Sequence, residues 1–467
     1  MKIHFIAIGG SVMHNMALAM KNKGYTVTGS DDEVNEPSRT RLQKQGLLPQ
    51  KDGWFPEKLD KSYDSVILGM HAREDNPELI RAKELGLRIF SYPEYMYEQT
   101  KDKIRVVVGG SHGKTTITSM ILHVLKYAKK DFDYLVGAQL QGFDTMVKLT
   151  KEAPIAVFEG DEYLASPIDK RPKFHLYKPN IAIISGIAWD HINVFPTYKS
   201  YVEQFEKFIH LIEPNGSLMY CAADTELKHL VETTVTDSMD YTDDNPRKSA
   251  KSVAKTPYAV PPHTIENGTT YLIHSNKKIP LKIFGDHNLM NLEGARLVCE
   301  KLGISNELFY EAIQSFTGAA KRLEQVKITP DFAFYKDFAH SPSKLKATIE
   351  AMKSQYPNRH LVACMELHTF SSLNENFLKE YKDCMKQADD AIVYFNPHTI
   401  EHKKLKPITI EQVKEAFDDE KLKVFTQSKQ VTDYLKAIRW KNKNLLMMTS
   451  GNFDGVDFVA LANELLQ

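Results

Sequence analysis

A glycine-bounded turn between an apolar run and an amphipathic segment is the part of this sequence best suited to chemistry. Residues 104–108 (Ile-Arg-Val-Val-Val) are rich in β-branched side chains, which predicts a buried parallel strand. Two glycines follow at 109–110, and residues 113–116 (Gly-Lys-Thr-Thr) open a segment with apolar residues at helical spacing. Such a strand, glycine turn and helix start present free N–H groups and a positive helix end to an anion. The pattern therefore predicts a phosphate cradle.

Two side chains of this turn suit the chemistry of a polyphosphate. Lys114 supplies a positive charge, and Thr115 supplies a hydroxyl that can bind a metal ion. The full P-loop pattern has a glycine five residues before Gly113, where this chain has Val108, so the loop is a shortened one. The strand before it and the helix after it still predict a site for a nucleoside triphosphate.

Length and composition narrow the class of protein. The 467 residues are enough for about three domains. Lys plus Arg and Asp plus Glu number 60 each without a basic block, so nothing predicts nucleic-acid binding. No apolar stretch approaches the roughly 18 residues of a membrane span, and no signal peptide precedes the first strand. The four cysteines show neither metal spacing nor a disulfide framework (221, 299, 364 and 384). We expect a cytoplasmic enzyme.

The first hundred residues predict one α/β unit. A strand over 2–8, glycines at 9–10, a helix over 13–23 and a strand over 25–31 resemble a dinucleotide-type βαβ motif. In that motif a phosphate lies at the first helix, and an acidic residue after the second strand, here Asp31, reaches a ribose. Ala7 and Val12 stand where the full fingerprint has glycines, so a plain βα turn explains the pattern equally well.

The central segment adds polar residues at strand ends. Strands are predicted at 154–158 and 180–184, and polar clusters follow both. Because the carboxyl ends of parallel strands line one crevice, Lys114, Glu159 and His191 are expected to converge. Glu159 could bind magnesium, and His191 could bind a second metal ion or accept a proton. The alternatives are a solvated acidic loop and a structural histidine. The polar segment 236–270 predicts a hairpin excursion or a mobile loop.

The last part of the chain alternates strands and helices again, which predicts a second doubly wound domain. Strands are expected at 332–338, 359–365, 390–395 and 444–450, and helices at 343–355, 376–388 and 456–466. We therefore predict an α/β protein of three domains: residues 1–102, 103–318 and 319–467.

Residues on both sides of the predicted boundary at 318 could contact a nucleotide. Asn288 and Asn291 share a helical face and could read the edge of an adenine, or Asn288 could simply cap the helix. Arg322 could hold phosphates and Asp337 ribose hydroxyls, or the two could form a surface charge pair.

Taken in order, these motifs resemble the Mur ligase family over essentially the whole chain. Members are cytoplasmic three-domain enzymes of peptidoglycan synthesis. The resemblance rests on IHFIAIGGSVM, TGSD and EDNPEL in the first hundred residues, on GSHGKTT, EGDEY, DH and GDHNLMN in the centre, and on KRLE and DFAHSP at the start of the last domain. The glycine-rich start resembles the branch that acts on UDP-N-acetylmuramate.

The resemblance implies a Rossmann-like UDP-binding domain, a P-loop-type ATPase domain with a parallel sheet, and a Rossmann-like ligase domain. ATP and Mg²⁺ are the implied cofactors. The implied catalytic residues are Lys114, Glu159 and His191, and the implied metal ligands are Thr115, Glu159 and His191. The implied ATP-binding residues are Gly110, Ser111, His112, Gly113, Lys114, Thr115, Thr116, Asn288, Asn291, Arg322 and Asp337. The implied UDP-sugar-binding residues are Gly9, Gly10, Ser11, Ser30, Asp31 and His71.

The implied reaction joins the lactyl carboxylate of UDP-N-acetylmuramate to an amine through an acyl phosphate. Residues 169–174 and 447–455 resemble the branch that recycles murein peptides, which predicts L-Ala-γ-D-Glu-meso-diaminopimelate as the amine. Residues 365–372 resemble the branch that adds L-alanine, which is the alternative. We expect a monomer or a weak dimer.

Three residues depart from the pattern of many relatives. Ala188 replaces an acidic residue, Ser341 a histidine and Lys321 an arginine. The departures at Ala188 and Ser341 leave open a UDP-sugar-sensing ATPase that no longer ligates. A ligase that adds glutamate to a folate-like acceptor is a further rival, since it would share the central domain.

Overall fold

The computed structural model describes most of the chain, and it divides that chain into two compact units. The described residues are 1–70, 72–140, 142–189, 194–234, 238–239, 248–249, 252–319 and 322–466. One unit comprises residues 1–259 and 291–312, and the other comprises 260–290 and 313–467. The predicted boundaries after residues 102 and 318 stay predictions.

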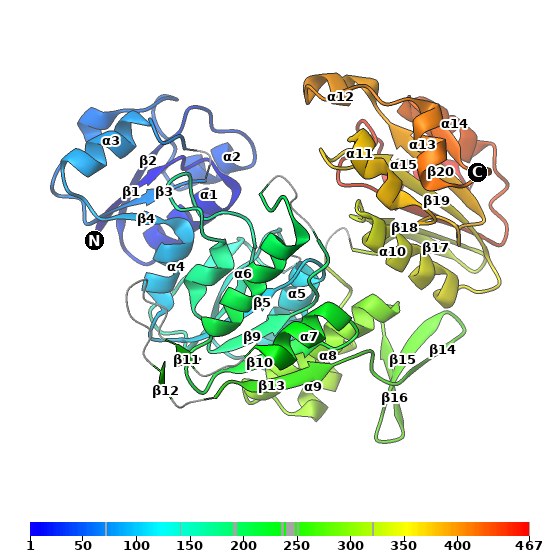
Figure 1. Ribbon diagram of the computed structural model, residues 1–467, viewed down its shortest axis with the longest axis horizontal. Helices are drawn as coiled ribbons and strands as arrows, with labels where there is room; N and C mark the ends of the chain where they lie inside the picture. The colour runs from blue at the N-terminus through cyan, green and yellow to red at the C-terminus, as the bar shows by residue number, and fades with distance from the viewer. Residues whose placement is uncertain are drawn as a thin grey trace. The chain divides into compact units, whose positions relative to one another are not determined.

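The N-terminal part of the first unit is a four-stranded parallel sheet in the order β2-β1-β3-β4 (Figure 1). Its strands are β1 (Lys2–Ile6), β2 (Thr26–Ser30), β3 (Ser65–Leu68) and β4 (Ile89–Ser91). Its helices are α1 (Ser11–Asn22), α2 (Ser38–Lys44), α3 (Pro77–Glu84) and α4 (Tyr92–Thr100), with a short 3-10 turn η1 (Pro56–Lys58). The predicted strand–turn–helix–strand order at residues 2–31 is confirmed.

The central part of the first unit is a seven-stranded sheet in the order β13-β10-β9-β5-β8-β6-β7. Its strands are β5 (Ile104–Gly109), β6 (Phe132–Leu135), β7 (Val147–Lys148), β8 (Ile155–Glu159), β9 (Ile181–Ile184), β10 (Ser217–Cys221) and β13 (Ala254–Tyr258). Only the β6–β7 pair is antiparallel among these described pairings. The helical elements are α5 (Lys114–Tyr127), η2 (Lys173–Tyr177), α6 (Tyr198–His210), α7 (Thr225–Thr233), and most of α8 (Asp286–Lys301) and α9 (Asn306–Ile313), whose residues 286–290 and 313 belong to the second unit.

Part of the segment 236–270 confirms the predicted hairpin excursion, because residues 263–266 pair antiparallel with residues 269–272, and part of it differs from the prediction. Its residues 254–258 form β13, which pairs in parallel with β10 at the edge of the central sheet. The strand contains Pro257 and has mixed exposure, so its sequence lacks the apolar run of a buried strand. A two-stranded pair, β11 (Ser238–Met239) with β12 (Lys248–Ser249), precedes it.

The second unit contains two sheets. A three-stranded antiparallel sheet is formed by β14 (His263–Glu266), β15 (Thr269–His274) and β16 (Lys277–Leu281). A six-stranded sheet has the order β17-β18-β22-β19-β20-β21, parallel except for the β17–β18 pair. Its strands are β17 (Glu324–Thr329), β18 (Phe332–Asp337), β19 (His360–Leu367), β20 (Asp390–Phe395), β21 (Lys423–Phe425) and β22 (Lys443–Met448).

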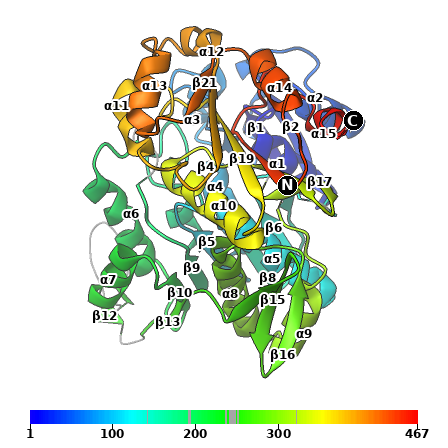
Figure 2. The ribbon, with the colours of Figure 1, turned by 90° about the vertical axis from the view of Figure 1, so that its right-hand side faces the viewer.

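Helices cover both faces of the six-stranded sheet (Figure 2). On one face, α10 (Pro342–Gln355) buries Leu345, Ile349 and Met352 against β19 and β22. On the other, α14 (Ser428–Lys436) and α15 (Phe458–Glu464) bury apolar residues against the same strands. This doubly wound arrangement confirms the predicted α/β class.

One predicted helix of this unit is wrong. Residues 376–388 form a single helical turn, α11 (Glu375–Leu378), a 3-10 turn, η3 (Lys379–Tyr381), and then irregular turns. Asp383 has a left-handed backbone (φ 59°), which ends any helix there. Helices α12 (Pro397–His402) and α13 (Ile410–Phe417) were not predicted. Within the described part of the chain, none of the helices combines the length and apolar character that crossing a bilayer requires.

We predict that Gly294→Ala destabilises the first unit, although the same change inside an exposed helix stabilises by about 1 kcal/mol. A Cβ at Gly294 would lie 2.6 Å from Cδ1 of Ile183 and 3.1 Å from Cζ of Tyr258. Such overpacking costs about 1–3 kcal/mol, so the urea midpoint followed by circular dichroism should fall. Ile183→Val removes the clashing carbon, and the double variant should be more stable than Gly294→Ala alone. An unchanged or higher midpoint for Gly294→Ala would contradict this packing.

Candidate active site

The phosphate loop lies between β5 and α5, as predicted, and its glycines are required by close backbone contacts. Gly110 has φ 124°, and a Cβ there would lie 2.8 Å from the backbone nitrogen of Ser185. Gly113 has φ 78° and immediately precedes α5, where a Cβ would lie 2.3 Å from Oδ1 of Asn291. Both positions therefore exclude larger residues. The loop turns into the helix without a side-chain cap, which leaves the first N–H groups of α5 available to an anion.

Lys114, the first residue of α5, is mostly buried in a polar cluster. Its Nζ donates to the carbonyl oxygen of Gly110 at 2.6 Å and to Oε2 of Glu162 at 2.7 Å. Glu162 is fully buried, and its other oxygen accepts a hydrogen bond from the Tyr201 hydroxyl at 3.2 Å. Burial acts to lower the pKa of Lys114, but Glu162 and Asp161 outweigh it and raise that pKa. Lys114 is therefore a fixed cation at the loop.

Thr115 and Glu159 form a pair of oxygen ligands beside this cation. The Thr115 hydroxyl donates to Oε1 of Glu159 at 2.7 Å, and the N–H of Gly137 donates to Oε2 at 2.8 Å. Glu159 is the last residue of β8, next to β5, which explains how residues 44 apart in sequence meet. A threonine hydroxyl with one carboxylate is a donor set that Mg²⁺ accepts beside phosphates. In the described residues, no group of three or more His, Cys, Asp or Glu side chains is placed to hold a metal ion.

The remaining polar groups of the loop fit a phosphate as well. Ser111 is 4% exposed, and its hydroxyl has no hydrogen-bond partner among the described residues, so an acceptor oxygen would satisfy it. The carbonyl oxygen of His112 accepts a hydrogen bond from the Ser185 hydroxyl, which ties the loop to the end of β9. Thr116 is buried in the first turn of α5. The arrangement can therefore bind a polyphosphate with a divalent cation.

The predicted residues of helix α8 have different surroundings. Asn291 belongs to the first unit and lies against Gly113 of the loop. Asn288 belongs to the second unit, and its amide donates to the carbonyl oxygen of Phe284 at 2.9 Å within its own helix. Both side chains are buried. The structure thus brings Asn291 into contact with the loop, whereas Asn288 bonds within its own helix.

Arg322 and Asp337 are neighbours in the second unit. Both oxygens of Asp337 accept backbone N–H groups at 2.6 Å, one from Leu323 and one from Ala339. Burial raises the pKa of Asp337, although Arg322 and these N–H groups act in the opposite direction. The Arg322 guanidinium lies 4.9 Å from the centre of the Phe338 ring. Asp337 is thus a rigidly held carboxylate at the end of β18.

The N-terminal glycine turn contacts Asp31, the acidic residue that directly follows the second strand. The N–H of Gly9 donates to Oδ2 of Asp31 at 2.6 Å, and Gly10 precedes α1. Ala7 adopts the left-handed conformation (φ 65°) that glycine favours, so the turn keeps its shape without the fingerprint glycine. Ser11 begins α1, and its hydroxyl contacts Sδ of Met146 at 3.4 Å. Ser30 is buried at the end of β2.

Several predicted residues lie outside the described residues: His71, Asp190, His191 and Lys321. Of the three side chains expected to converge, the structure describes Lys114 and Glu159, and their hydrogen-bond partners belong to one cluster. No role was predicted for Glu162, Asp161 or Lys173. Glu162 pairs with Lys114, and Lys173 donates to Oδ2 of Asp161 at 2.5 Å. The position of both acids directly after a strand was a usable signal, whereas no local pattern marks Lys173.

Comparison with known proteins agrees with this geometry. The Mur ligase family catalytic domain matches residues 2–103, and the Mur ligase middle domain matches residues 108–299. A UDP-N-acetylmuramate–L-alanine ligase of Aquifex aeolicus is 30% identical over 388 residues, which cover 82% of each chain. The chain belongs to the Mur ligase family, whose members are ATP-dependent amide ligases of peptidoglycan synthesis.

Relatives of two kinds are found within that family. The L-alanine ligase of Caldicellulosiruptor bescii is 32% identical over 397 residues, covering 84% of this chain and 83% of the relative. The UDP-N-acetylmuramate–L-alanyl-γ-D-glutamyl-meso-2,6-diaminoheptandioate ligase of Haemophilus influenzae is 26% identical over 464 residues, covering 97% of each chain.

Solved structures share the fold. The UDP-N-acetylmuramate–alanine ligase of Thermotoga maritima has a TM-score of 0.66 at 21% identity, covering 100% of this chain and 98% of the other. A murein peptide ligase of Psychrobacter arcticus has a TM-score of 0.62 at 22% identity, with the same coverage. At these identities the likeness shows the fold alone.

We predict a pH-dependent stability that arises from Asp31. Burial, reinforced by neighbouring Asp32, raises the pKa of Asp31 from 3.8 to about 6. The native protein therefore holds a proton that the unfolded chain has released, so its free energy of unfolding should fall as pH rises from about 4 to about 7. Asp31→Asn cannot titrate and should show a smaller fall. Urea unfolding at a series of pH values measures this, and identical pH profiles for the two proteins would refute it.

Proposed function

We propose that this protein joins the lactyl carboxylate of UDP-N-acetylmuramate to the amine of L-alanine at the cost of ATP. The observation that carries the proposal is the cluster in which Lys114, Thr115 and Glu159 meet at a glycine-bounded loop. The relatives from Aquifex aeolicus and Caldicellulosiruptor bescii, both L-alanine ligases, favour L-alanine over the tripeptide predicted from residues 169–174 and 447–455.

The tripeptide L-Ala-γ-D-Glu-meso-diaminopimelate is the second candidate for the amine. Two specific observations favour it. The Haemophilus influenzae relative, whose name includes that peptide, aligns over 97% of this chain, and the two segments above resemble the branch that recycles murein peptides. Both candidates share the acceptor, the nucleotide and the first chemical step, so they differ only in the second.

In the proposed first step, the lactyl carboxylate attacks the γ-phosphate of ATP and ADP leaves, which forms an acyl phosphate. The amine then attacks the acyl carbon, and phosphate leaves as the amide forms. The chain's part is to neutralise charge and to align two anions. The ammonium of Lys114 and the N–H groups at the start of α5 would face the phosphates, and the Ser111 hydroxyl would donate to one of their oxygens.

Magnesium fits the donor set of this cluster. Thr115 and Glu159 would hold it, and when bound it would neutralise negative charge on the phosphates. His191 is proposed as the ligand of a second metal ion. Glu162 keeps Lys114 charged and directed toward the loop, so the cation is already in place before the nucleotide binds.

We propose that the nucleotide-sugar binds at the N-terminal turn. The first turn of α1 would face its phosphates, and Asp31 would accept a ribose hydroxyl, with Gly9, Gly10, Ser11, Ser30 and His71 around it. For the rest of ATP, Asn291 and Asn288 would contact the adenine, Arg322 a phosphate and Asp337 the ribose. Three domains, 1–102, 103–318 and 319–467, would then close around the reactants, with hinges near residues 101–103 and 318–321.

The choice of amine is tested by phosphate release with ATP and UDP-N-acetylmuramate, comparing L-alanine with the tripeptide. We expect L-alanine to support the higher kcat/KM.

Lys114→Ala should lower kcat at least about a hundredfold, because it removes the fixed cation at the transferred phosphate, while UDP-N-acetylmuramate still binds by calorimetry.

Other outcomes of that assay decide among the rivals. A higher kcat/KM with the tripeptide would replace L-alanine by the second candidate. Phosphate release without an amide product would identify a UDP-sugar-sensing ATPase. Thermal stabilisation by pterins rather than by UDP-sugars would point to a folate-like acceptor. Near-normal turnover of Lys114→Ala would overturn the phosphate site itself.

The metal role is tested by magnesium titration of two carboxylate variants. Glu159→Ala removes a proposed ligand and should raise the Mg²⁺ concentration for half-maximal activity at least about tenfold. Glu162→Gln, a matched change in the same acidic cluster, removes the partner of Lys114 instead. It should raise KM for ATP with little change in the Mg²⁺ requirement. An unchanged magnesium curve for Glu159→Ala would count against Glu159 as a ligand.

A further inference from the structure

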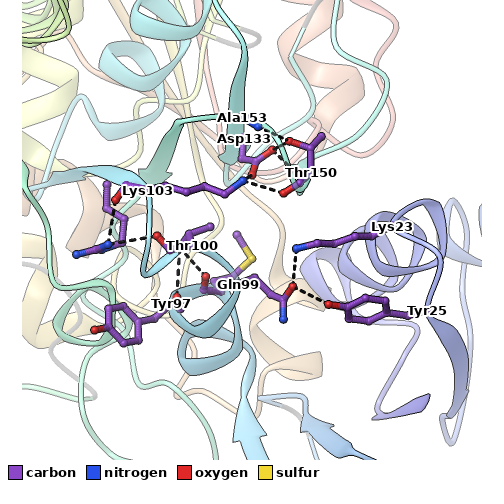
Figure 3. A network of polar contacts seen from close by, with 11 residues as sticks. Lys23, Tyr25, Tyr97, Gln99, Thr100, Lys103, Asp133, Thr150 and Ala153 are labelled. Atoms are coloured by element: carbon purple, nitrogen blue, oxygen red, sulfur yellow. Dashed lines mark hydrogen bonds and ion pairs between the residues drawn. The ribbon is translucent and has the colours of Figure 1, made fainter. Parts of the chain in front are cut away.

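A cavity of about 760 Å³ lies in the first unit, at the end of α1 opposite the glycine turn. One wall comes from the N-terminal part, with Asn22, Lys23 and Tyr25, and the other comes from Thr145, from β7 and from the residues after it, up to Glu152. Figure 3 shows part of this region, with Lys23, Tyr25 and Gln99 on one side and Lys103, Asp133 and Thr150 on the other. The volume is in the range of a small-molecule site.

The charges around this cavity are mainly positive. Lys23, Lys148 and Lys151 line it, and Glu152 is its one acidic lining residue. In the described part of the chain, none of the three lysines forms an ion pair with a carboxylate; Lys23 instead donates to Oε1 of Gln99 at 2.7 Å. Burial and the positive charge of Lys103 lower the pKa of Lys23, and the carboxylates of Asp133 and Glu152 offset part of that effect.

The buried carboxylate of Asp133, which contacts the lining residue Thr150, is already paired with a lysine. Asp133 is fully buried and accepts from Nζ of Lys103 at 2.5 Å, and from the N–H and hydroxyl of Thr150 at 2.8 Å each (Figure 3). The positive charge of Lys103 offsets much of its negative charge, so, among the described residues, Asp133 forms no ion pair with the lining lysines. Three lysines against one glutamate give the lining of this half-open cavity an excess of positive charge, which favours a bound anion.

The floor of the cavity is apolar. Ala19, Val147 and Leu149 line it, and each is almost fully buried. The ring of Tyr25 adds an aromatic side, with its hydroxyl directed to Gln99 at 3.3 Å. We propose that this cavity binds an organic anion, with its negative groups on the three lysines and its apolar part on Ala19, Val147 and Leu149.

This site is distinct from the nucleotide-sugar site but shares two elements with it. Helix α1 has 12 residues, so its two ends are about 16 Å apart at 1.5 Å per residue. The segment that lines the cavity also touches the other end of α1, because the N–H of Met146 donates to Oδ1 of Asn15 at 3.1 Å and Met146 contacts Ser11. A ligand that moves residues 146–152 therefore changes the surroundings of the glycine turn. This coupling rests on the proposed function, whereas the binding itself does not.

The probe for this site is 8-anilinonaphthalene-1-sulfonate, an aromatic sulfonate whose fluorescence rises on an apolar surface. Titration of the full chain should show one saturable class of binding that persists with saturating UDP-N-acetylmuramate and ATP. Lys148→Glu/Lys151→Glu replaces two attractive charges by repulsive ones and should raise the Kd at least about tenfold. The matched control, Lys129→Glu/Lys130→Glu, makes the same charge change on exposed residues after α5 and should leave the Kd unchanged.

Three results would overturn the site: an unchanged Kd in Lys148→Glu/Lys151→Glu, an equal loss in the control, or competitive displacement of the probe by either substrate. Thermal unfolding verifies that the variants are folded, and Lys151→Glu alone, at an exposed residue, provides a milder version of the same test. The coupling is read separately, as a change in KM for UDP-N-acetylmuramate with the probe bound. An inactive enzyme that still binds the probe through these lysines would remove the proposed function but keep the site.

Discussion

The mostly buried ammonium of Lys114 is the charge around which the glycine loop and its polar neighbours are arranged. A cation taken from water needs partners, and Glu162 with the carbonyl oxygen of Gly110 supplies them. Glu162 is held in turn by Tyr201 of α6, so a helix far along the chain stabilises the residue that fixes the lysine. The same surroundings keep the lysine charged, which is the state that a polyphosphate requires.

Close packing of the backbone sets the second constraint. The loop passes so near to Ser185 and Asn291 that its glycines cannot carry a side chain. This leaves N–H groups rather than side chains facing the space beside Lys114, and N–H groups are the donors that suit phosphate oxygens. The Thr115–Glu159 pair then adds oxygen ligands on the adjacent strand end. Loop, cation and oxygen pair therefore form one electrostatic unit.

The N-terminal sheet and the central sheet are linked through α1 and β7. Asn15 of α1 accepts a hydrogen bond from the backbone of Met146, just before β7, and the same strand continues into the lysine-lined cavity. One helix thus faces the proposed nucleotide-sugar site at its first turn and the cavity at its last. Many α/β proteins lack this arrangement. Here it results from the side chains that α1 and the segment around β7 place in contact.

The sequence by itself determined the elements whose signals are local. The β-branched run before the loop, the glycines, and Lys114 with Thr115 follow from spacing and from backbone sterics, and the structure has them where they were predicted. The βαβ turn was likewise readable, even though Ala7 stands in place of a glycine, whereas the hydrogen bond from Gly9 to Asp31 was not predicted.

Tertiary structure alone decided the partners. Strand order, which no local pattern encodes, pairs Lys114 with Glu162 and Lys173 with Asp161. It also places three lysines around one cavity. The same is true of β13, whose mixed sequence becomes a strand because β10 offers it an open edge, and of residues 376–388, where packing and a left-handed Asp383 override a helical pattern. Local sequence sets backbone preference and side-chain chemistry, whereas long-range packing decides which of those side chains share a dry, charged space.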